Sequence, residues 1–514
     1  MTIKETSNSD QEQYDLVVIG GGLGGLTCAC IFGMEGHKVC VLDKNKQIGG
    51  NLQTFSRDKV IFDSGVHYVG SLAPGQTLNK LFTYLGIMDK LNIRKMDEDI
   101  FDGIIFGDDP KIYRHAQGYD RFIANLVEDF PEEETAIRTY CDTIQNICNQ
   151  FPLYNLNKNI LNNKYSDISI DAKGFVDSLT QNIRLRNVLM GSNILYAGVA
   201  HKSPLYTHSL VANSYIESAY RFVNGGSQIA RLLVKQIRGR GGIVKTRAKI
   251  KKLVEVDGRI KYAEDEQGQR YYGKNFISNL HPKQTLQLTN SKLIRNAYRT
   301  RINSLKNTIS CFNVDIVLKK DAFLYRNSNY YYSQNNNVWE AVESKSKDWP
   351  LTYALFFPAP ENGNNIYEKG ISVLSYMGIE EVSPWANTFH TSIDDESRGE
   401  DYELFKKEKA EILISKVDKS FPGLKEAIKS YTCYTPLTLR DYIGTDDGSM
   451  YGVFRNINDI GNAFISPKTK IPNLFLTGQN LSMHGVLGVA LNSVATSSEI
   501  FGLKYLIDKI NGEK

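Results

Sequence analysis

Three glycines near the start of the chain have the spacing of a diphosphate-binding turn. Gly20, Gly22 and Gly25 form a G-x-G-x-x-G pattern between two apolar runs. In this pattern the first glycine permits a tight turn, the second lets the backbone approach a pyrophosphate, and the third lets a helix pack on a strand. The start of that helix offers unpaired N–H groups and a partial positive charge. The pattern predicts a dinucleotide site, and the competing interpretation is a tight strand–helix turn without a ligand.

An acidic residue and a second glycine pair follow at positions that suit a long cofactor. Asp43 ends the next apolar run, 18 residues after Gly25, where its carboxylate could accept hydrogen bonds from a ribose diol. The pair Gly49–Gly50 places further backbone along the cofactor, which favours FAD over the shorter NAD. Residues 239–242 are also glycine-rich, but they follow a predicted helix and fit a turn. The sequence therefore offers no dedicated NAD(P)H domain.

Three separated blocks of sequence have the pattern of one α/β domain. Their predicted elements are a buried strand at Leu16–Ile19, a helix at Leu26–Met34, a strand at Val39–Leu42, a helix at Ile229–Ile237, a hairpin at Lys249–Ala263 with its turn at Asp257–Gly258, a strand at Phe276–Asn279, a strand at Asn473–Leu476 and a helix from Val486. All-apolar runs of four residues suit strands covered on both faces, and Asp-Gly between alternating runs suits a hairpin.

The segments between these blocks differ in pattern, because residues 96–220 are mainly helical and residues 300–430 are rich in aromatic side chains. We therefore predict a discontinuous FAD-binding domain and an inserted substrate-binding domain. The first takes residues 14–95, 221–299 and 431–514, and the second takes residues 96–220 and 300–430. The asparagine-rich stretch Asn327–Asn337 is predicted to be a surface hairpin.

Composition excludes several classes of protein. The chain has 514 residues, 41 % of them hydrophobic and 23 % charged, with a net charge of +4. These values exclude a disordered chain, a collagen, a coiled-coil rod and a histone-like binder, so we expect no nucleic-acid partner. The 7 cysteines include no C-x-x-C pair, which argues against a metal site and against disulfides and favours a reducing compartment.

Two N-terminal segments bear on location. Leu16–Met34 is uncharged and long enough to span a membrane, but its glycines favour a buried strand, turn and helix. Met1–Gln13 is polar and does not have the pattern of a signal peptide. We therefore expect a cytoplasmic protein, with peripheral contact to a membrane left open.

Several motifs resemble the FAD-dependent phytoene desaturase superfamily and, within it, retinol saturases and carotenoid isomerases. These motifs are Asp43–Gly70 with Thr54–Phe55 and Phe62–Gly70, the middle block Asn224–Asn279, Thr435–Thr438 with Gly448–Gly452, and the closing motif Pro472–Asn480. The resemblance covers most of the chain. It implies an α/β fold with a glutathione-reductase-like FAD-binding Rossmann domain and an inserted α+β substrate domain.

The resemblance also implies which residues hold FAD. The residues that match the family's motifs are Gly20, Gly22 and Gly25 at the pyrophosphate, Asp43 at the adenosine ribose with Lys44 beside it, the loop residues Gly49, Gly50 and Asn51, Ile250 at the adenine, Gly478 and Gln479 along the ribityl-pyrophosphate, and Gly485, Val486, Leu487 and Gly488 at the flavin N1/O2 edge. A helix start suits that edge, because reduced flavin carries negative charge there. Two positions depart from the family, since most relatives have Arg at position 51 and many have Asp at position 479.

The implied activity is oxidation or reduction of a carbon–carbon bond in a conjugated polyene or isoprenoid lipid, with saturation of a double bond favoured. The alternatives are a desaturase, a reduced-flavin cis/trans isomerase, a non-catalytic prenyl-lipid-binding protein like the GDP-dissociation inhibitors, and an amine oxidase. His67 and Tyr68 are the candidate catalytic residues, with His484 a further candidate. The competing interpretation makes His67 a structural hydrogen-bonding residue and Tyr68 a packing residue. The substrate would be a long apolar lipid, and the electron donor or acceptor stays open.

Overall fold

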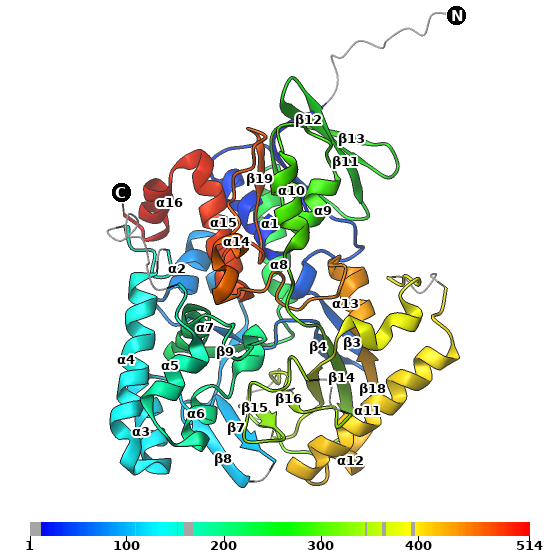
Figure 1. The fold of residues 1–514 in the computed structure, drawn as a ribbon. Helices are drawn as coiled ribbons and strands as arrows, with labels where there is room; N and C mark the ends of the chain where they lie inside the picture. Colours follow the sequence, from blue (N-terminus) through cyan, green and yellow to red (C-terminus); the bar gives the residue numbers. More distant parts are fainter. Residues whose placement is uncertain are drawn as a thin grey trace, which may run out of the picture.

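A computed structural model describes residues 12–107, 109–151, 153–158, 168–344, 347–361, 366–391 and 396–513. Its helices are α1 (Leu23–Met34), α2 (Thr77–Tyr84), α3 (Tyr119–Asp129), α4 (Glu134–Gln150), α5 (Ala172–Leu179), α6 (Ile183–Leu189), α7 (Leu205–Glu217), α8 (Ser227–Gly239), α9 (Pro282–Gln287), α10 (Asn296–Ser304), α11 (Glu400–Ser420), α12 (Leu424–Ala427), α13 (Pro436–Ile443), α14 (Ile460–Ala463), α15 (Gly485–Phe501) and α16 (Leu503–Ile510). Two large sheets organise the molecule (Figure 1).

The first sheet joins strands from the three predicted blocks. In spatial order it contains β10 (Ile243–Lys245), β2 (Val39–Leu42), β1 (Gln13–Ile19), β13 (Arg270–Ser278), β12 (Arg259–Asp265) and β11 (Ile250–Val256), and β19 (Leu474–Leu476) also pairs with β13. The pairs β10–β2, β2–β1, β1–β13 and β13–β19 are parallel, whereas β11–β12–β13 is an antiparallel meander. The predicted strands and the hairpin at Asp257–Gly258 are confirmed.

Helix α1 lies inside this layer rather than on its surface. It packs on β1 and β2 and against α8 and α15, and nearly all of its residues are buried. A helix that is apolar on all sides is stable only when it is covered on all sides. The uncharged run Leu16–Met34 is therefore a buried strand, turn and helix, as its glycines predicted.

The second sheet runs in the order β18 (Ile428–Tyr434), β14 (Cys311–Leu318), β17 (Gly370–Tyr376), β16 (Thr352–Phe356), β15 (Asn329–Ser333), β7 (Asp102–Phe106) and β8 (Asp109–His115). Figure 1 shows it in the lower part of the molecule, with α3 and α4 on one side and α11 on the other. Strand β18 crosses the predicted boundary at residues 430 and 431. The boundaries of the two domains stay a prediction.

The predicted surface hairpin at Asn327–Asn337 is wrong. Residues Asn329–Ser333 form β15, which lies inside the second sheet between β7 and β16. The side chain of Asn329 is fully buried, accepts a hydrogen bond from Arg221 at 2.9 Å and donates one to Asp102 at 3.0 Å. Asparagine favours exposed turns when it has no partner, and these two buried partners reverse that preference.

Two small sheets complete the fold. One is the hairpin of β3 (Thr54–Arg57) and β4 (Val60–Asp63), and the other contains β5 (Val69–Gly70), β9 (Ala219–Phe222) and β6 (Ile93–Lys95). Both lie on the segment that leads from the glycine turn toward the second sheet. They therefore position the chain around residues 63–70 between the two large sheets.

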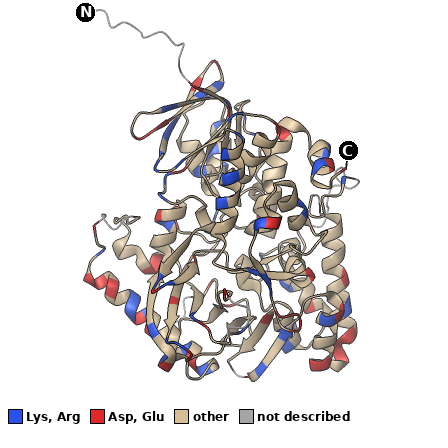
Figure 2. Cartoon of the chain, turned by 180° about the vertical axis from the view of Figure 1, so that it is seen from behind, with Lys and Arg blue, Asp and Glu red and all other residues tan. Residues whose placement is uncertain are grey.

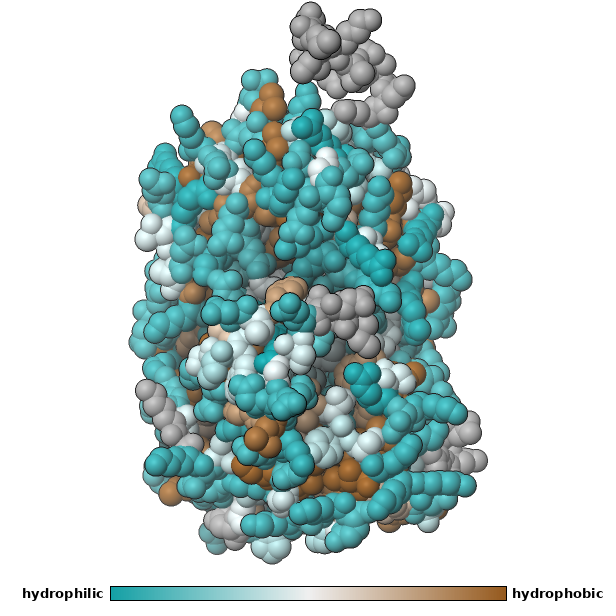
Figure 3. Space-filling model, turned by 90° about the vertical axis from the view of Figure 1, so that its right-hand side faces the viewer, coloured by the Kyte–Doolittle hydropathy of each residue, from teal (hydrophilic) through white to brown (hydrophobic). Residues whose placement is uncertain are grey.

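The surface is mixed in charge and largely hydrophilic. Figure 2 shows basic and acidic residues interspersed over the chain, and on the face in Figure 3 apolar residues gather in the lower part. Among the described residues, no helix combines the length and apolar character needed to cross a bilayer. In the same part of the chain, no group of three or more His, Cys, Asp or Glu side chains could hold a metal ion.

Candidate functional site

The G-x-G-x-x-G segment forms the turn between β1 and α1. Gly20 follows the end of β1 with a φ of +96°, a conformation that residues with a side chain rarely adopt. A Cβ atom on Gly25 would lie 2.1 Å from the backbone oxygen of Gly20, so α1 can approach the turn only because position 25 has no side chain. The loop at Gly49 is tied to this turn by a 2.9 Å hydrogen bond from its N–H to the carbonyl of Gly21.

Asp43 lies at the end of β2 beside the same turn. One of its carboxylate oxygens accepts a 2.7 Å hydrogen bond from the N–H of Gly21, and the other accepts one of 2.7 Å from the N–H of Asn45. Burial raises the pKa of this carboxyl, while the two backbone N–H groups act in the opposite direction. Asp43 therefore braces the glycine turn, and each of its oxygens keeps a further lone pair for a ligand.

These residues line a cavity of about 400 Å³, which we call the glycine cavity. The predicted cofactor residues on its wall are Gly20, Gly22, Asp43, Lys44, Gly49, Gly50, Asn51, Ile250, Gly478, Gln479, Gly485 and Val486. Asp43 is the only carboxylate on the described part of that wall. Gly25 is not on the wall but packs behind it, and Leu487 and Gly488 line the neighbouring cavity.

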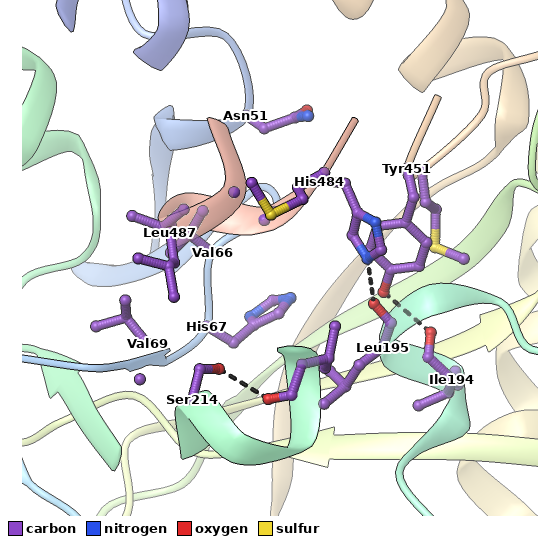
Figure 4. Close-up of a pocket in the computed structure, with 18 of the residues that line it drawn as sticks. Asn51, Val66, His67, Val69, Ile194, Leu195, Ser214, Tyr451, His484 and Leu487 are labelled. Atoms are coloured by element: carbon purple, nitrogen blue, oxygen red, sulfur yellow. Dashed lines mark hydrogen bonds between the residues drawn. The ribbon is translucent and has the colours of Figure 1, made fainter. Parts of the chain in front are cut away.

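A second cavity of about 180 Å³, the apolar chamber, adjoins the glycine cavity. The two share the wall residues Asn51, Gly65, Val66, Met450, Tyr451, Gly485 and Val486. Most other chamber residues are aliphatic or aromatic. Figure 4 shows His67, Val69 and Ser214 opposite the start of α15, with Ile194, Leu195 and Tyr451 to one side.

His67 lies on the chamber wall with its ring free of hydrogen bonds. The ring stacks on Phe356 with centroids 4.2 Å apart and an interplanar angle of 4°. Its Nε2 atom is buried and has no partner among the described residues. Burial, with a smaller effect from the positive charge of Arg221, lowers the pKa of His67 to about 4. The imidazole is therefore neutral at physiological pH.

The hydroxyl of Tyr68 is held in the second sheet, although its ring lines the chamber. It donates to Asp102 of β7 at 2.9 Å and shares a 2.6 Å hydrogen bond with Tyr331 of β15, and neither partner lines the chamber. Burial raises the pKa of Asp102 to about 7 and holds the pKa of Tyr68 well above its usual value. These contacts favour the packing interpretation for Tyr68.

Helix α15 begins at the junction of the two cavities. Its first residues, from Gly485, line both, so its unpaired N–H groups face the site where a flavin ring is expected. His484 precedes the helix, shares a 3.1 Å hydrogen bond with the carbonyl of Leu195 through Nε2 and packs on Tyr451 (Figure 4). Its ring is thereby committed to holding the loop.

Asp63 fastens the loop that carries His67. Its carboxylate accepts a 2.7 Å hydrogen bond from the N–H of Gly226, and burial raises its pKa to about 7, well above the usual value for aspartate. Since the folded protein binds this proton more tightly than the unfolded chain, ionisation of Asp63 lowers the free energy of unfolding as pH rises from about 4 to 7.

We therefore expect Asp63→Asn, which keeps the acceptor oxygen, to become more favourable relative to wild type as pH rises from 5 to 8. Urea unfolding of both proteins at each pH measures the difference. Asp109→Asn is the control, because the pKa of Asp109 is lowered and the variant should lose stability relative to wild type as pH rises from about 2 to 4 and then change no further. A difference for Asp63→Asn that does not vary with pH contradicts the expectation.

Several site residues had no signal of their own in the sequence. Asn279 follows β13 and presses on the glycine turn, since its Oδ1 would lie 2.5 Å from a Cβ on Gly24 and 2.5 Å from one on Gly478. Thr445 has a buried Oγ1 without a partner and lies on the glycine cavity. Phe356 comes from the second sheet. Only the closing of the fold brings these residues to the site.

Comparisons with known proteins agree with the motifs. A family model described as an NAD(P)-binding Rossmann-like domain matches residues 18–85. The all-trans-retinol 13,14-reductase of Rattus norvegicus is 27 % identical over 95 % of this chain and 86 % of its own length. Prolycopene isomerase 2 of an Oncidium hybrid cultivar is 23 % identical over 96 % of this chain and 84 % of its own. An inactive all-trans-retinol 13,14-reductase of Danio rerio is also 23 % identical, over 99 % of this chain and 89 % of its own.

Solved structures share the fold. A putrescine oxidase has a TM-score of 0.63 at 12 % identity, covering 96 % of this chain and 99 % of its own. A conjugated-linoleic-acid-producing fatty acid isomerase from P. acnes has a TM-score of 0.59 at 12 % identity, with 95 % and 99 % covered. Rab GDI from Plasmodium falciparum has a TM-score of 0.51 at 11 % identity, with 96 % and 99 % covered. The predicted fold class is confirmed.

One of these relatives is inactive and the solved structures show only the fold, so activity has to be argued from the site. The ancestry itself is clear, because the similarity runs from the glycine turn to the closing motif. Over nearly its whole length this chain is a homologue of the all-trans-retinol 13,14-reductases and the prolycopene isomerases.

Proposed function

We propose that the protein is an FAD-dependent oxidoreductase that saturates a carbon–carbon double bond in a conjugated polyene or isoprenoid lipid. The observation that carries the proposal is the junction of the two cavities at the start of α15. A cavity suited to a dinucleotide opens there on an apolar chamber, so a flavin ring and a lipid chain could meet in a place shielded from water. The reductase homologues support the same reaction.

The residues of the glycine cavity fit FAD. Its glycines leave backbone N–H groups open to a diphosphate, and Asp43 is its only described carboxylate, so no other negative charge opposes the phosphates. The unpartnered Oγ1 of Thr445 is available to a ligand on the same wall. Ile250 begins β11 at the adenine end, and Gly478 and Gln479 lie along the middle of the site. Bound FAD supplies hydride exchange with a substrate carbon.

We assign His67 to the chamber wall as a positioning residue. The parallel His67–Phe356 stack presents flat ring surface toward the chamber, and a conjugated chain is also flat. A neutral imidazole adds little as a proton donor at neutral pH. The pH profile of wild-type activity should therefore show no break from His67 between pH 5 and 8.

Two substitutions separate this role from acid–base catalysis. We expect His67→Phe to keep activity within about threefold of wild type, because it preserves the stack. His67→Ala should lose about tenfold or more, because it opens the wall. A proton-transfer role predicts instead that both variants lose about 10²- to 10⁴-fold. Steady-state turnover, with flavin content measured on each preparation, distinguishes the two results.

The isomerase alternative has support from the prolycopene isomerase homologues. A desaturase and a non-catalytic prenyl-lipid-binding protein complete the set. One experiment orders all four: the purified protein is examined for flavin absorption and released FAD, reduced anaerobically, and incubated with a panel of polyenes. Mass spectrometry then reports a gain of two hydrogens for a saturase or no mass change with a new isomer for an isomerase.

The oxidised holoprotein is run in parallel, where loss of two hydrogens identifies a desaturase. A colourless protein whose melting temperature does not rise with added FAD overturns the proposal and favours the lipid-binding alternative. Contact with a membrane and the identity of the electron donor lie beyond these measurements. Flotation with liposomes tests the predicted peripheral contact directly.

A further inference from the structure

Three polar side chains interrupt the apolar chamber with atoms that have no partner. Tyr206 and Thr207 belong to the first turn of α7, and Arg455 comes from the segment after β18 and α13. The hydroxyl oxygens of Tyr206 and Thr207 and the Nε atom of Arg455 are all buried and lack a hydrogen bond in the described structure. Unsatisfied groups in a buried position are costly, so three on one wall indicate a missing ligand.

Arg455 carries a positive charge that the described residues do not neutralise. Its Nη1 donates to the carbonyl of Val453 at 2.9 Å and its Nη2 to the carbonyl of Asn480 at 3.0 Å. It forms no ion pair with a described carboxylate, and only 7 % of the residue is exposed. Burial lowers its pKa, and Tyr206 is the neighbour that opposes this change. An anion at Nε would supply the missing charge.

This cluster lies away from the glycine cavity. None of the three residues belongs to the wall that the two cavities share. Thr207 and Ser214 are seven residues apart on α7, about 10 Å along its axis, and Ser214 contacts the strand end near His67 through a 3.0 Å hydrogen bond from Ser71. The Tyr206 ring is held by Phe151 and Phe464, with centroids 5.5 and 5.9 Å away.

We propose that Arg455, Tyr206 and Thr207 bind the terminal carboxylate of an amphipathic polyene whose chain runs through the chamber. The proposal rests on the proposed function and names its substrate class. A guanidinium binds a carboxylate through two parallel N–H donors, and Arg455 has Nε and further N–H groups to offer. The two hydroxyls can donate to the same oxygens. The apolar wall then leads the chain toward His67.

The test measures binding rather than turnover. Wild-type holoprotein is titrated with all-trans-retinoic acid, its methyl ester and all-trans-retinol, which share one chain and differ at the end, and dissociation constants come from equilibrium dialysis. We expect the acid to bind about 10- to 100-fold more tightly than the ester, the range for hydrogen bonds to a charged group. Equal affinities for acid and ester overturn the proposal.

Variants identify the residues. Arg455→Gln should remove the preference for the acid, and Arg455→Lys should restore part of it. Tyr206→Phe and Thr207→Val remove single hydroxyls without changing the packed shape, so each should weaken the acid severalfold and leave the ester unchanged. Circular dichroism and melting temperature confirm that each variant is folded. If Arg455→Gln fails to fold, the two hydroxyl variants decide, and unchanged acid binding in both overturns the proposal.

Failure here is distinguishable from failure of the proposed function. A yellow protein that saturates polyenes but binds acid and ester equally keeps the function and loses the carboxylate site. A colourless protein that prefers the acid keeps the site and loses the function. The dialysis result and the flavin spectrum are read independently on the same preparation.

Discussion

We expect Gly25→Ala to purify without bound flavin and to be less stable than wild type by about 2–3 kcal/mol, the upper part of the range for overpacking. The added Cβ would lie 2.1 Å from the backbone oxygen of Gly20 and 2.9 Å from Cγ1 of Val18. The first of these atoms is backbone, so no rotamer change can relieve the contact. Helix α1 must shift from β1, and the turn that would hold the diphosphate moves with it.

Gly33→Ala is a matched control in the same helix. A Cβ there would have Cδ of Arg240 as its nearest neighbour, at 3.6 Å, which is ordinary contact. Since alanine favours helix more than glycine does, this variant should keep its flavin and gain about 0.5–1 kcal/mol. The visible spectrum and urea unfolding, measured on both variants, check the pair. A Gly25→Ala protein that retains full flavin content refutes the diphosphate role of the turn.

The second large effect is expected at Asp441, which is fully buried on α13. Its carboxylate pairs with Arg398 and with Arg440, the latter at 2.8 Å, and accepts a 2.8 Å hydrogen bond from the N–H of His390. Its backbone carbonyl accepts a 2.7 Å hydrogen bond from Lys44 on the glycine cavity. Asp441→Ala leaves the buried guanidinium of Arg398 without its partner, so we expect a loss of about 3–5 kcal/mol.

The same variant should weaken FAD binding, because α13 holds Lys44 and the adjacent loop against the cavity. Asp441→Asn keeps one acceptor oxygen and should fall between Ala and wild type. Asp58→Asn removes an exposed ion pair with Lys429 and should leave stability within experimental error. Denaturant unfolding and FAD titration of the apoprotein measure both quantities. Equal stability of Asp441→Ala and wild type contradicts the role of this ion pair.

The comparison of the two predicted catalytic residues shows where sequence reasoning ended. His67 and Tyr68 are neighbours in one motif, and nothing local separates their roles. Tyr68 turns its hydroxyl to Asp102 and Tyr331 in the second sheet, whereas the ring of His67 stays free beside Phe356. Their partners lie on strands far along the chain, so only the packed sheets determine which side chain is open to the chamber.

The sequence by itself determined the glycine turn, the parallel strands around it and the homology to retinol reductases and prolycopene isomerases. These features depend on residues close in the chain, where spacing, apolar runs and the missing side chain of glycine act directly. The tertiary structure alone decided the burial of Asn329, the position of Phe356 beside His67 and the meeting of Arg455 with Tyr206. Such contacts arise when distant segments close around a shared core, and local periodicity carries no record of which segments will meet.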